Sequence, residues 1–220
     1  MLTPQNLSLI HLVIPPRVEP AVGEKPPLLV LLHGVRSNER DLAGLADYLD
    51  PRFVTVSVRS PLTLGYDQYG WYDISFTAEG VRADETPAIE GKAKLSRFLD
   101  EAIEAYGTDP GRVYIGGFSQ GAIMSLYLAL TEPEKVTGTI ILSGRLLPMV
   151  MNEVASIEVL QGKPFFVAHG ISDPVLTIAQ GRQVRDFLQS LPVALTYHEY
   201  PMGHTISEET LADLQNWLVP

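Results

Sequence analysis

Short apolar runs recur along the chain, and the segments between them space their apolar residues as helices do. Uninterrupted runs of this kind are typical of strands covered on both faces. They occupy residues 28–32, 53–58, 113–115, 139–142 and 165–168. Helical patterns occupy residues 41–49, 87–106, 122–130, 178–188 and 208–218. This alternation predicts an α/β fold with a mostly parallel central sheet and helices on both faces.

Two segments alternate apolar and polar residues and are predicted to be half-exposed strands. They are residues 7–13, followed by Pro15 and Pro16, and residues 195–200. A length of 220 residues is ordinary for one α/β domain with a full core, so we expect residues 1–220 to form a single domain.

The charge and cysteine content exclude several classes of function. A formal net charge of -10 disfavours nucleic acid as a partner, because phosphate recognition depends on Lys and Arg. The absence of cysteine excludes disulfides, thiolate metal sites and a cysteine nucleophile. No signal peptide and no apolar stretch of about 20 residues can be found, which predicts a cytoplasmic protein without stable membrane insertion.

The segment from Gly116 to Gly121 carries a G-x-S-x-G motif with Ser119 at its centre. An apolar run precedes it and an apolar helical pattern follows at once, which is the context of a nucleophile elbow. In such a strained turn the two flanking glycines are needed where a Cβ would clash with backbone. We therefore predict that Ser119 is a nucleophile presented at a helix N-terminus.

A serine hydroxyl needs a histidine base, and only three histidines follow the motif. His198 lies within the alternating run 195–200 and is interpreted as an ordinary strand residue. His169 ends an apolar run and is expected to shape the loop that follows it. His204 lies in a loop between the last predicted strand and helix, so we predict that it is the base.

Asp173 is the candidate for the acid that orients His204. It follows the run 165–168 at the edge of the sheet where open α/β sheets place their sites. Asp186 and Asp213 fall within helical patterns and are interpreted as solvated charges.

Acyl transfer also needs N–H donors for the developing oxyanion. One candidate is the backbone N–H of Gln120, the residue after the nucleophile. The second should lie in the loop after the early strand, 33–38, where the N–H of Val35 is the candidate.

Together these motifs resemble the phospholipase/carboxylesterase family, which includes acyl-protein thioesterases, and the likeness spans nearly the whole chain. The loop 33–41 looks more like the bacterial esterase branch than the eukaryotic thioesterases. The segments that carry the resemblance are 32–34, the elbow, 172–175, 203–204, 70–73 and 143–144. Tyr72 and the loop after Gly34 depart from the family pattern.

The resemblance implies a compact α/β-hydrolase fold without a large cap domain. It implies that the protein is a carboxylesterase, with acyl-thioesterase or lysophospholipase activity as further options. It also implies Ser119, Asp173 and His204 as catalytic residues, Val35 and Gln120 as oxyanion donors, and no metal or organic cofactor. The substrate would be a small-molecule acyl ester or thioester. Two loop segments, 62–76 and 146–150, are candidates for the acyl pocket, with Trp71 and Leu147 as the substrate-binding candidates.

Other functions remain open from sequence. A peptidase or a carbon–carbon bond hydrolase on the same scaffold would share these residues and differ in the pocket. A non-catalytic binding protein would be expected to lack one of the three catalytic residues, and none is missing. An exposed edge strand or helix face could support a homodimer, although no residue pattern requires one.

Overall fold

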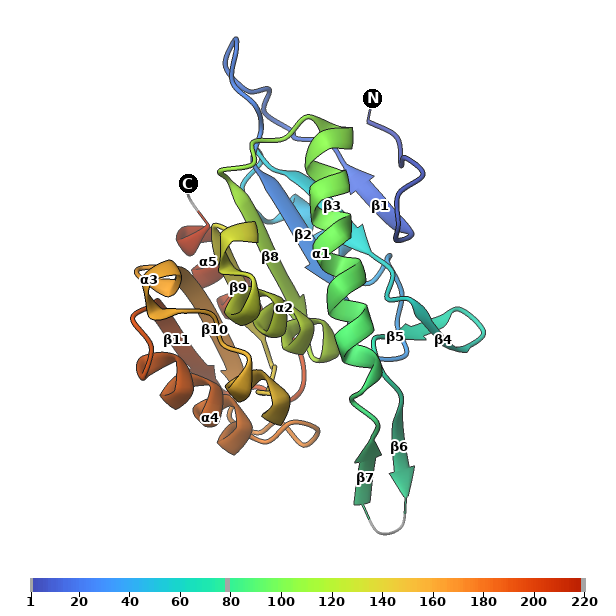
Figure 1. Cartoon of the computed structure of the whole chain (residues 1–220), viewed down its shortest axis with the longest axis vertical. Helices are drawn as coiled ribbons and strands as arrows, with labels where there is room; N and C mark the ends of the chain where they lie inside the picture. The colour runs from blue at the N-terminus through green and yellow to red at the C-terminus, as the bar shows by residue number, and fades with distance from the viewer. Residues whose placement is uncertain (1, 78–79, 219–220) are drawn as a thin grey trace.

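A computed structural model describes residues 2–77 and 80–218, and its centre is a seven-stranded sheet (Figure 1). Strand pairing is parallel throughout except at one edge, where β1 runs antiparallel to β3. In spatial order the sheet contains β1 (His11–Ile14), β3 (Val54–Val58), β2 (Leu28–Leu32), β8 (Val113–Phe118), β9 (Gly138–Leu142), β10 (Pro164–Gly170) and β11 (Ala194–Tyr200). The predicted mostly parallel sheet is confirmed.

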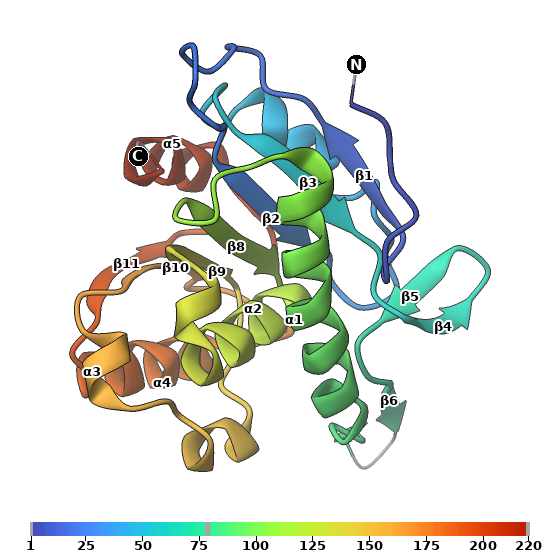
Figure 2. The same cartoon turned by 45° about the horizontal axis from the view of Figure 1, so that its top comes forward.

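Successive residues of the central strand β2 point to opposite faces, and each face has its own apolar core. Leu28, Val30 and Leu32 pack in one cluster and Leu29 and Leu31 in the other. The first cluster includes residues of α1 (Pro87–Tyr106), α2 (Gln120–Thr131) and α4 (Ile178–Gln189), and the second includes residues of α5 (Glu208–Trp217). Figure 2 shows α5 on the far side of the sheet from α1, α2 and α4, so helices cover both faces as predicted.

The expected helix at 41–49 is wrong in type and length. Residues Ala43–Asp47 form a single 3-10 segment, with hydrogen bonds such as Leu45 N–H to the Leu42 carbonyl at 3.0 Å. Gly44 lowers helix propensity and Pro51 follows closely, so the segment is too short to propagate an α-helix. Leu42 and Leu49 are buried on either side of this segment, and their separation of seven residues imitates the apolar spacing of an α-helix.

Two hairpins between β3 and α1 replace the loop that the sequence predicted there. The first pairs β4 (Leu62–Gly65) with β5 (Gln68–Gly70), and the second pairs β6 (Ile74–Thr77) with β7 (Gly80–Ala83). Figure 1 shows both at the periphery of the molecule, with the second hairpin extending beyond the start of α1. Neither is a separate cap domain.

Three short helical segments were also not predicted: η2 (Pro133–Lys135), η3 (Pro148–Asn152) and α3 (Ile157–Leu160). They lie in the connections that flank β9. No helix within residues 2–77 and 80–218 is long and apolar enough to cross a bilayer.

Candidate active site

Ser119 lies between the end of β8 and the start of α2 with a positive φ. Its φ is 55° and its ψ is -118°, which is a strained combination for a residue with a Cβ. The turn is held at both ends, because Ser119 N–H donates to the Leu142 carbonyl at 2.9 Å and the Ser119 carbonyl accepts from Ile123 N–H at 3.1 Å. The strand-to-helix context predicted for the motif is confirmed.

The two glycines of the motif permit this turn because the neighbouring backbone approaches them closely. A Cβ on Gly121 would lie 1.9 Å from the Leu32 carbonyl oxygen, and a Cβ on Gly117 would lie 2.5 Å from the same atom. Any side chain at either position would force β2 and α2 apart. The glycines thus set the distance between the elbow and the strand that leads to Val35.

Asp173 and His204 form a direct pair. His204 Nδ1 lies 2.6 Å from Asp173 Oδ2. The other carboxylate oxygen, Oδ1, accepts the N–H groups of Val175 at 2.8 Å and Leu176 at 2.9 Å. Three donors therefore fix a buried carboxylate. Among residues 2–77 and 80–218, the His204 ring is the one side chain that hydrogen-bonds this carboxylate, and the buried His169 Nε2 lies 3.6 Å from Oδ2.

The loops that carry these two residues meet at backbone level. A Cβ on Gly170, at the end of β10, would lie 2.3 Å from the Gly203 carbonyl oxygen. Ser172 N–H donates to the Met202 carbonyl at 3.1 Å. Asp173 and His204 are 31 positions apart in the chain, and they meet because the loops that bear them follow parallel neighbouring strands, β10 and β11.

His204 also lies against the elbow. Its ring centre is 4.6 Å from that of Phe118, the residue before Ser119. Since Nδ1 donates its proton to the Asp173 carboxylate, Nε2 of the neutral ring has a free lone pair. Within residues 2–77 and 80–218, no hydrogen bond joins Ser119 Oγ to His204 Nε2, a contact that often tightens only when a substrate is bound.

The remaining two histidines after the elbow have the places that the sequence suggested. His198 lies in β11 with its side chain 40% exposed. His169 is fully buried at the end of β10, and its Nε2 donates to the Leu176 carbonyl at 2.7 Å. His169 therefore braces the loop that bears Asp173, as expected.

The two candidate oxyanion donors belong to segments that adjoin Ser119. A Cβ on Gly34 would be 3.4 Å from the Ser119 Cβ, so the loop after β2 contacts the nucleophile. In the described part of the chain the N–H of Val35 has no hydrogen-bond partner, whereas Arg36 N–H donates to the Tyr69 carbonyl at 2.8 Å. Gln120 is the first residue of α2, where a helix leaves its N–H groups unpaired.

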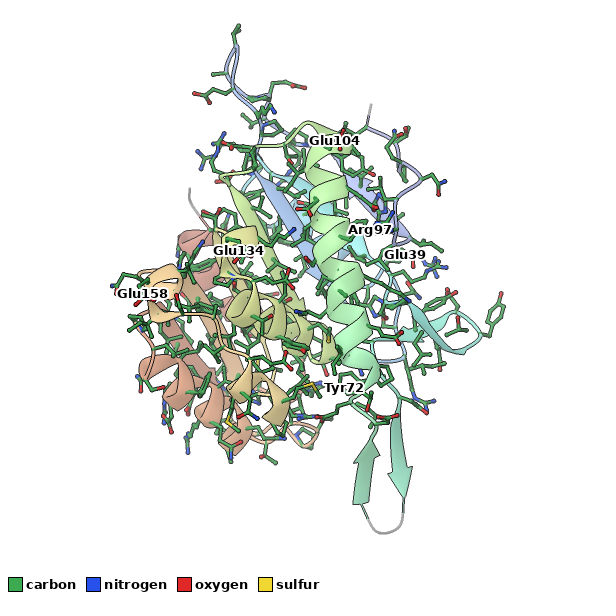
Figure 3. All side chains as sticks on the ribbon, in the orientation of Figure 1. Glu39, Tyr72, Arg97, Glu104, Glu134 and Glu158 are labelled. Carbon is green, nitrogen blue, oxygen red and sulfur yellow. The ribbon has the colours of Figure 1, made fainter. Side chains whose placement is uncertain are left out.

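The side chain of Gln120 has a role that sequence reasoning missed. Its Oε1 accepts Trp71 N–H at 2.7 Å and its Nε2 donates to the Tyr72 carbonyl at 2.8 Å, so the buried amide clamps the segment between β5 and β6. Burial raises the pKa of the Tyr72 hydroxyl to about 12. Figure 3 shows Tyr72 beside the start of α1. A buried glutamine at the start of an apolar helix was the available signal.

Trp71 and Leu147 are each only 1% exposed and belong to the larger core cluster. The Trp71 ring packs under α1, where a Cβ on Gly91 would lie 2.9 Å from it. Their contact with a substrate stays a prediction. Ile171 and Val175, which flank Asp173, are the exposed apolar side chains next to the pair, with exposures of 48% and 54%. The sequence reasoning did not select them.

No group of three or more His, Asp or Glu side chains in residues 2–77 and 80–218 is arranged to hold a metal ion.

A central parallel sheet with an antiparallel edge strand, a nucleophile elbow between a strand and a helix, and an Asp–His pair from later loops together define the α/β-hydrolase fold. Residues 15–219 match the phospholipase/carboxylesterase family. The chain belongs to this family and is a hydrolase of the carboxylesterase type.

Similar proteins span nearly the whole chain. Acyl-protein thioesterase 1 of Neurospora crassa is 31% identical, over 93% of this chain and 90% of its own length. The putative hydrolase MhqD of Bacillus subtilis is 27% identical, over 89% of this chain and 94% of its own. The structure of the Bacillus cereus carboxylesterase superposes with a TM-score of 0.81 at 26% identity, covering 97% of this chain and 94% of that one.

Proposed function

We propose that this protein hydrolyses small-molecule carboxylic esters or thioesters through an acyl-enzyme formed on Ser119, with His204 as base and Asp173 as the orienting acid. The observation that carries the proposal is the 2.6 Å bond between His204 Nδ1 and Asp173 Oδ2, on a ring that packs against the elbow. Its Nε2 lone pair is the acceptor that a serine nucleophile requires. The similarity to carboxylesterases and acyl-protein thioesterases supports the acyl substrate.

In the acylation step Ser119 Oγ attacks the acyl carbonyl while His204 Nε2 takes the hydroxyl proton. The carbonyl oxygen becomes an oxyanion that accepts hydrogen bonds from the N–H groups of Val35 and Gln120. The tetrahedral intermediate then collapses, the bond from carbon to the leaving oxygen or sulfur breaks, and His204 gives its proton to the leaving group.

In the deacylation step a water molecule takes the role of nucleophile and Ser119 Oγ becomes the leaving group. His204 takes a proton from the water, the resulting hydroxide attacks the ester carbonyl of the acyl-enzyme, and the same two N–H groups hold the second oxyanion. The bond from Ser119 Oγ to the acyl carbon breaks and His204 returns the proton to Oγ. Asp173 stays ionised and stabilises the imidazolium in both steps.

A binding protein on the same fold is the alternative from a different functional class. Its site would not need a strained serine, an Asp173 fixed by three donors and a Val35 N–H without a partner among the described residues, all in one place. Strain of this kind persists where the surrounding structure holds it for a purpose. A peptidase or carbon–carbon hydrolase would use the same residues, so substrates decide between these chemistries.

The first test is labelling with a fluorophosphonate and location of the adduct by mass spectrometry. We expect one adduct on Ser119, absent in Ser119→Ala and strongly reduced in His204→Ala. Ser190→Ala and His198→Ala are matched controls, because Ser190 is exposed, His198 is half-exposed in β11, and neither belongs to the elbow or its loops. Absence of labelling, or labelling elsewhere, would contradict the proposal.

The second test compares p-nitrophenyl esters and acyl thioesters of increasing chain length, a lysophospholipid, and a peptide amide. Hydrolysis of esters or thioesters that is lost in Ser119→Ala supports the proposed substrate class. Turnover of the peptide amide alone would show that the protein is a peptidase and not an esterase or thioesterase. Without a cap domain the site is expected to accept several chain lengths, so one sharply preferred length would contradict an open pocket.

A further inference from the structure

His33, at the end of β2, is a buried histidine that the proposed mechanism does not use. Its Nε2 lies 3.1 Å from the backbone N–H of Ser60. A backbone N–H can only donate, so Nε2 carries a lone pair and the proton of the neutral ring is on Nδ1. Burial lowers the pKa of His33, which favours this neutral form.

The protonated Nδ1 lies 2.7 Å from the Gly34 carbonyl oxygen. That oxygen also accepts Ser37 N–H at 3.3 Å. Two donors therefore hold the carbonyl of the peptide that joins Gly34 to Val35. The ring itself cannot rotate without losing its bond to Ser60, because both nitrogens are engaged.

The carbonyl of Gly34 and the N–H of Val35 belong to one planar trans peptide, so they point in opposite directions. Fixing the carbonyl on the side of His33 fixes the N–H on the other side. This N–H has no hydrogen-bond partner in the described part of the chain, and it belongs to the loop whose Gly34 approaches the Ser119 Cβ. Arg36, with φ at 64°, then turns the chain toward Tyr69.

We infer that His33 is a positioning residue that aims the Val35 N–H at the oxyanion through the Gly34 carbonyl. The inference rests on the proposed function, since it assigns His33 a part in the same hydrolysis. A positioning role differs from a purely structural role in its consequence: substitution of His33 should reduce transition-state stabilisation without weakening substrate binding. Removing a whole oxyanion donor costs about 10²–10³-fold in kcat, and misaligning one should cost roughly 10–100-fold.

Two substitutions separate the Nδ1 contact from the rest of the ring. In His33→Asn the amide nitrogen takes the position of Nδ1 and can donate to the Gly34 carbonyl. In His33→Gln the amide reaches the position of Nε2 and leaves that carbonyl without its donor. We expect Asn to retain kcat within about fivefold, and Gln and Ala to lose roughly 10–100-fold, with KM changed by less than about threefold.

The experiment measures kcat, KM, the rate of fluorophosphonate labelling and the thermal midpoint for wild type and the three variants, with His198→Asn as control. Labelling should fall in parallel with kcat, because phosphonylation also places an oxygen among the same donors. Equal activity in Asn and Gln, unchanged kcat in all variants, or a change in KM alone would overturn the inference. If His33→Ala does not fold, the comparison of Asn with Gln still decides.

Failure of the proposed function has a different signature. It would appear in the wild type, as no labelling of Ser119 and no ester or thioester turnover, before any variant is compared. An active wild type with indifferent His33 variants would overturn the positioning role alone.

Discussion

The His204 ring donates Nδ1–H to Asp173 Oδ2 at 2.6 Å, and the opposite oxygen of the same carboxylate is held by Val175 and Leu176 N–H groups. The carboxylate therefore cannot turn away from the ring. The ring keeps one tautomer and one orientation, which is the condition for a base to act on Ser119.

We predict that Asp173→Asn lowers kcat by about 10³–10⁴-fold with little change in KM. An asparagine amide can donate to Nδ1, which would put the ring proton on Nε2 and remove the base. Steady-state kinetics on an ester substrate measures this. Asp186→Asn is the control, because Asp186 is 63% exposed in α4. A variant within about tenfold of wild type would exclude Asp173 as the acid.

Gly121→Ala is expected to destabilise the protein by about 3 kcal/mol or more, because the new methyl group would lie 1.9 Å from the Leu32 carbonyl oxygen. Activity should fall with it, since the elbow and β2 must separate. Urea unfolding and ester turnover test this together. Gly44→Ala, where a Cβ meets nothing within 4 Å, should leave both nearly unchanged. A Gly121→Ala protein of wild-type stability would show that the contact relaxes without cost.

Gln120→Ala removes the buried amide that bonds Trp71 N–H and the Tyr72 carbonyl. Each backbone group left without a partner costs about 1–3 kcal/mol, so we expect a clear fall in the unfolding free energy. The backbone N–H of residue 120 stays in place, and kcat should fall less than in Asp173→Asn. Gln215→Ala, on the exposed face of α5, is the matched control in chemical unfolding. Equal stability of the two variants would contradict the clamp.

The N-terminal segment is fastened by a chain of hydrogen bonds, of which the two made by His11 are buried. Gln5 N–H donates to Tyr106 Oη at 3.1 Å, the Tyr106 hydroxyl bonds His11 Nε2, and His11 Nδ1 donates to the Leu9 carbonyl at 2.8 Å. Protonating Nε2 would break the bond from Tyr106. Burial accordingly lowers the pKa of His11 below 6.5.

This arrangement predicts that stability falls as the pH drops below about 6.5, because the unfolded chain binds a proton at His11 that the folded chain resists. Above that pH the contribution is fully present. In His11→Gln the group no longer titrates, so the fall in unfolding free energy between pH 7 and about 5 should become shallower. Urea unfolding at several pH values measures the slope. If the unfolding free energy of His11→Gln changes with pH as steeply as that of wild type and of the control His198→Gln, His11 is not a source of the pH dependence.

The strands of the core were predictable because burial on both faces leaves runs of mostly apolar residues in them, as in β2 and residues 165–168 of β10. The helix at Pro87–Tyr106 was predicted at its observed bounds. The segment 41–49 was not, because buried Leu42 and Leu49 imitate helical spacing around a single short turn. The hairpins β4–β5 and β6–β7 were missed because their strands are only three or four residues long and neither connection carries an Asn-Gly or Asp-Gly turn signal.

The sequence by itself determined the fold class and gave Ser119, Asp173 and His204 as the catalytic candidates, because a strand–turn–helix motif and the chain order of its partners are local and ordered features. Only the tertiary structure decided that Gln120 clamps Trp71 and Tyr72, that Trp71 is core, and that His33 holds the Gly34 carbonyl. These roles depend on which atoms meet across segments far apart in the chain. Residue type decides which hydrogen bonds a side chain can make, and the packing of β2, β8 and α2 decides which of them form.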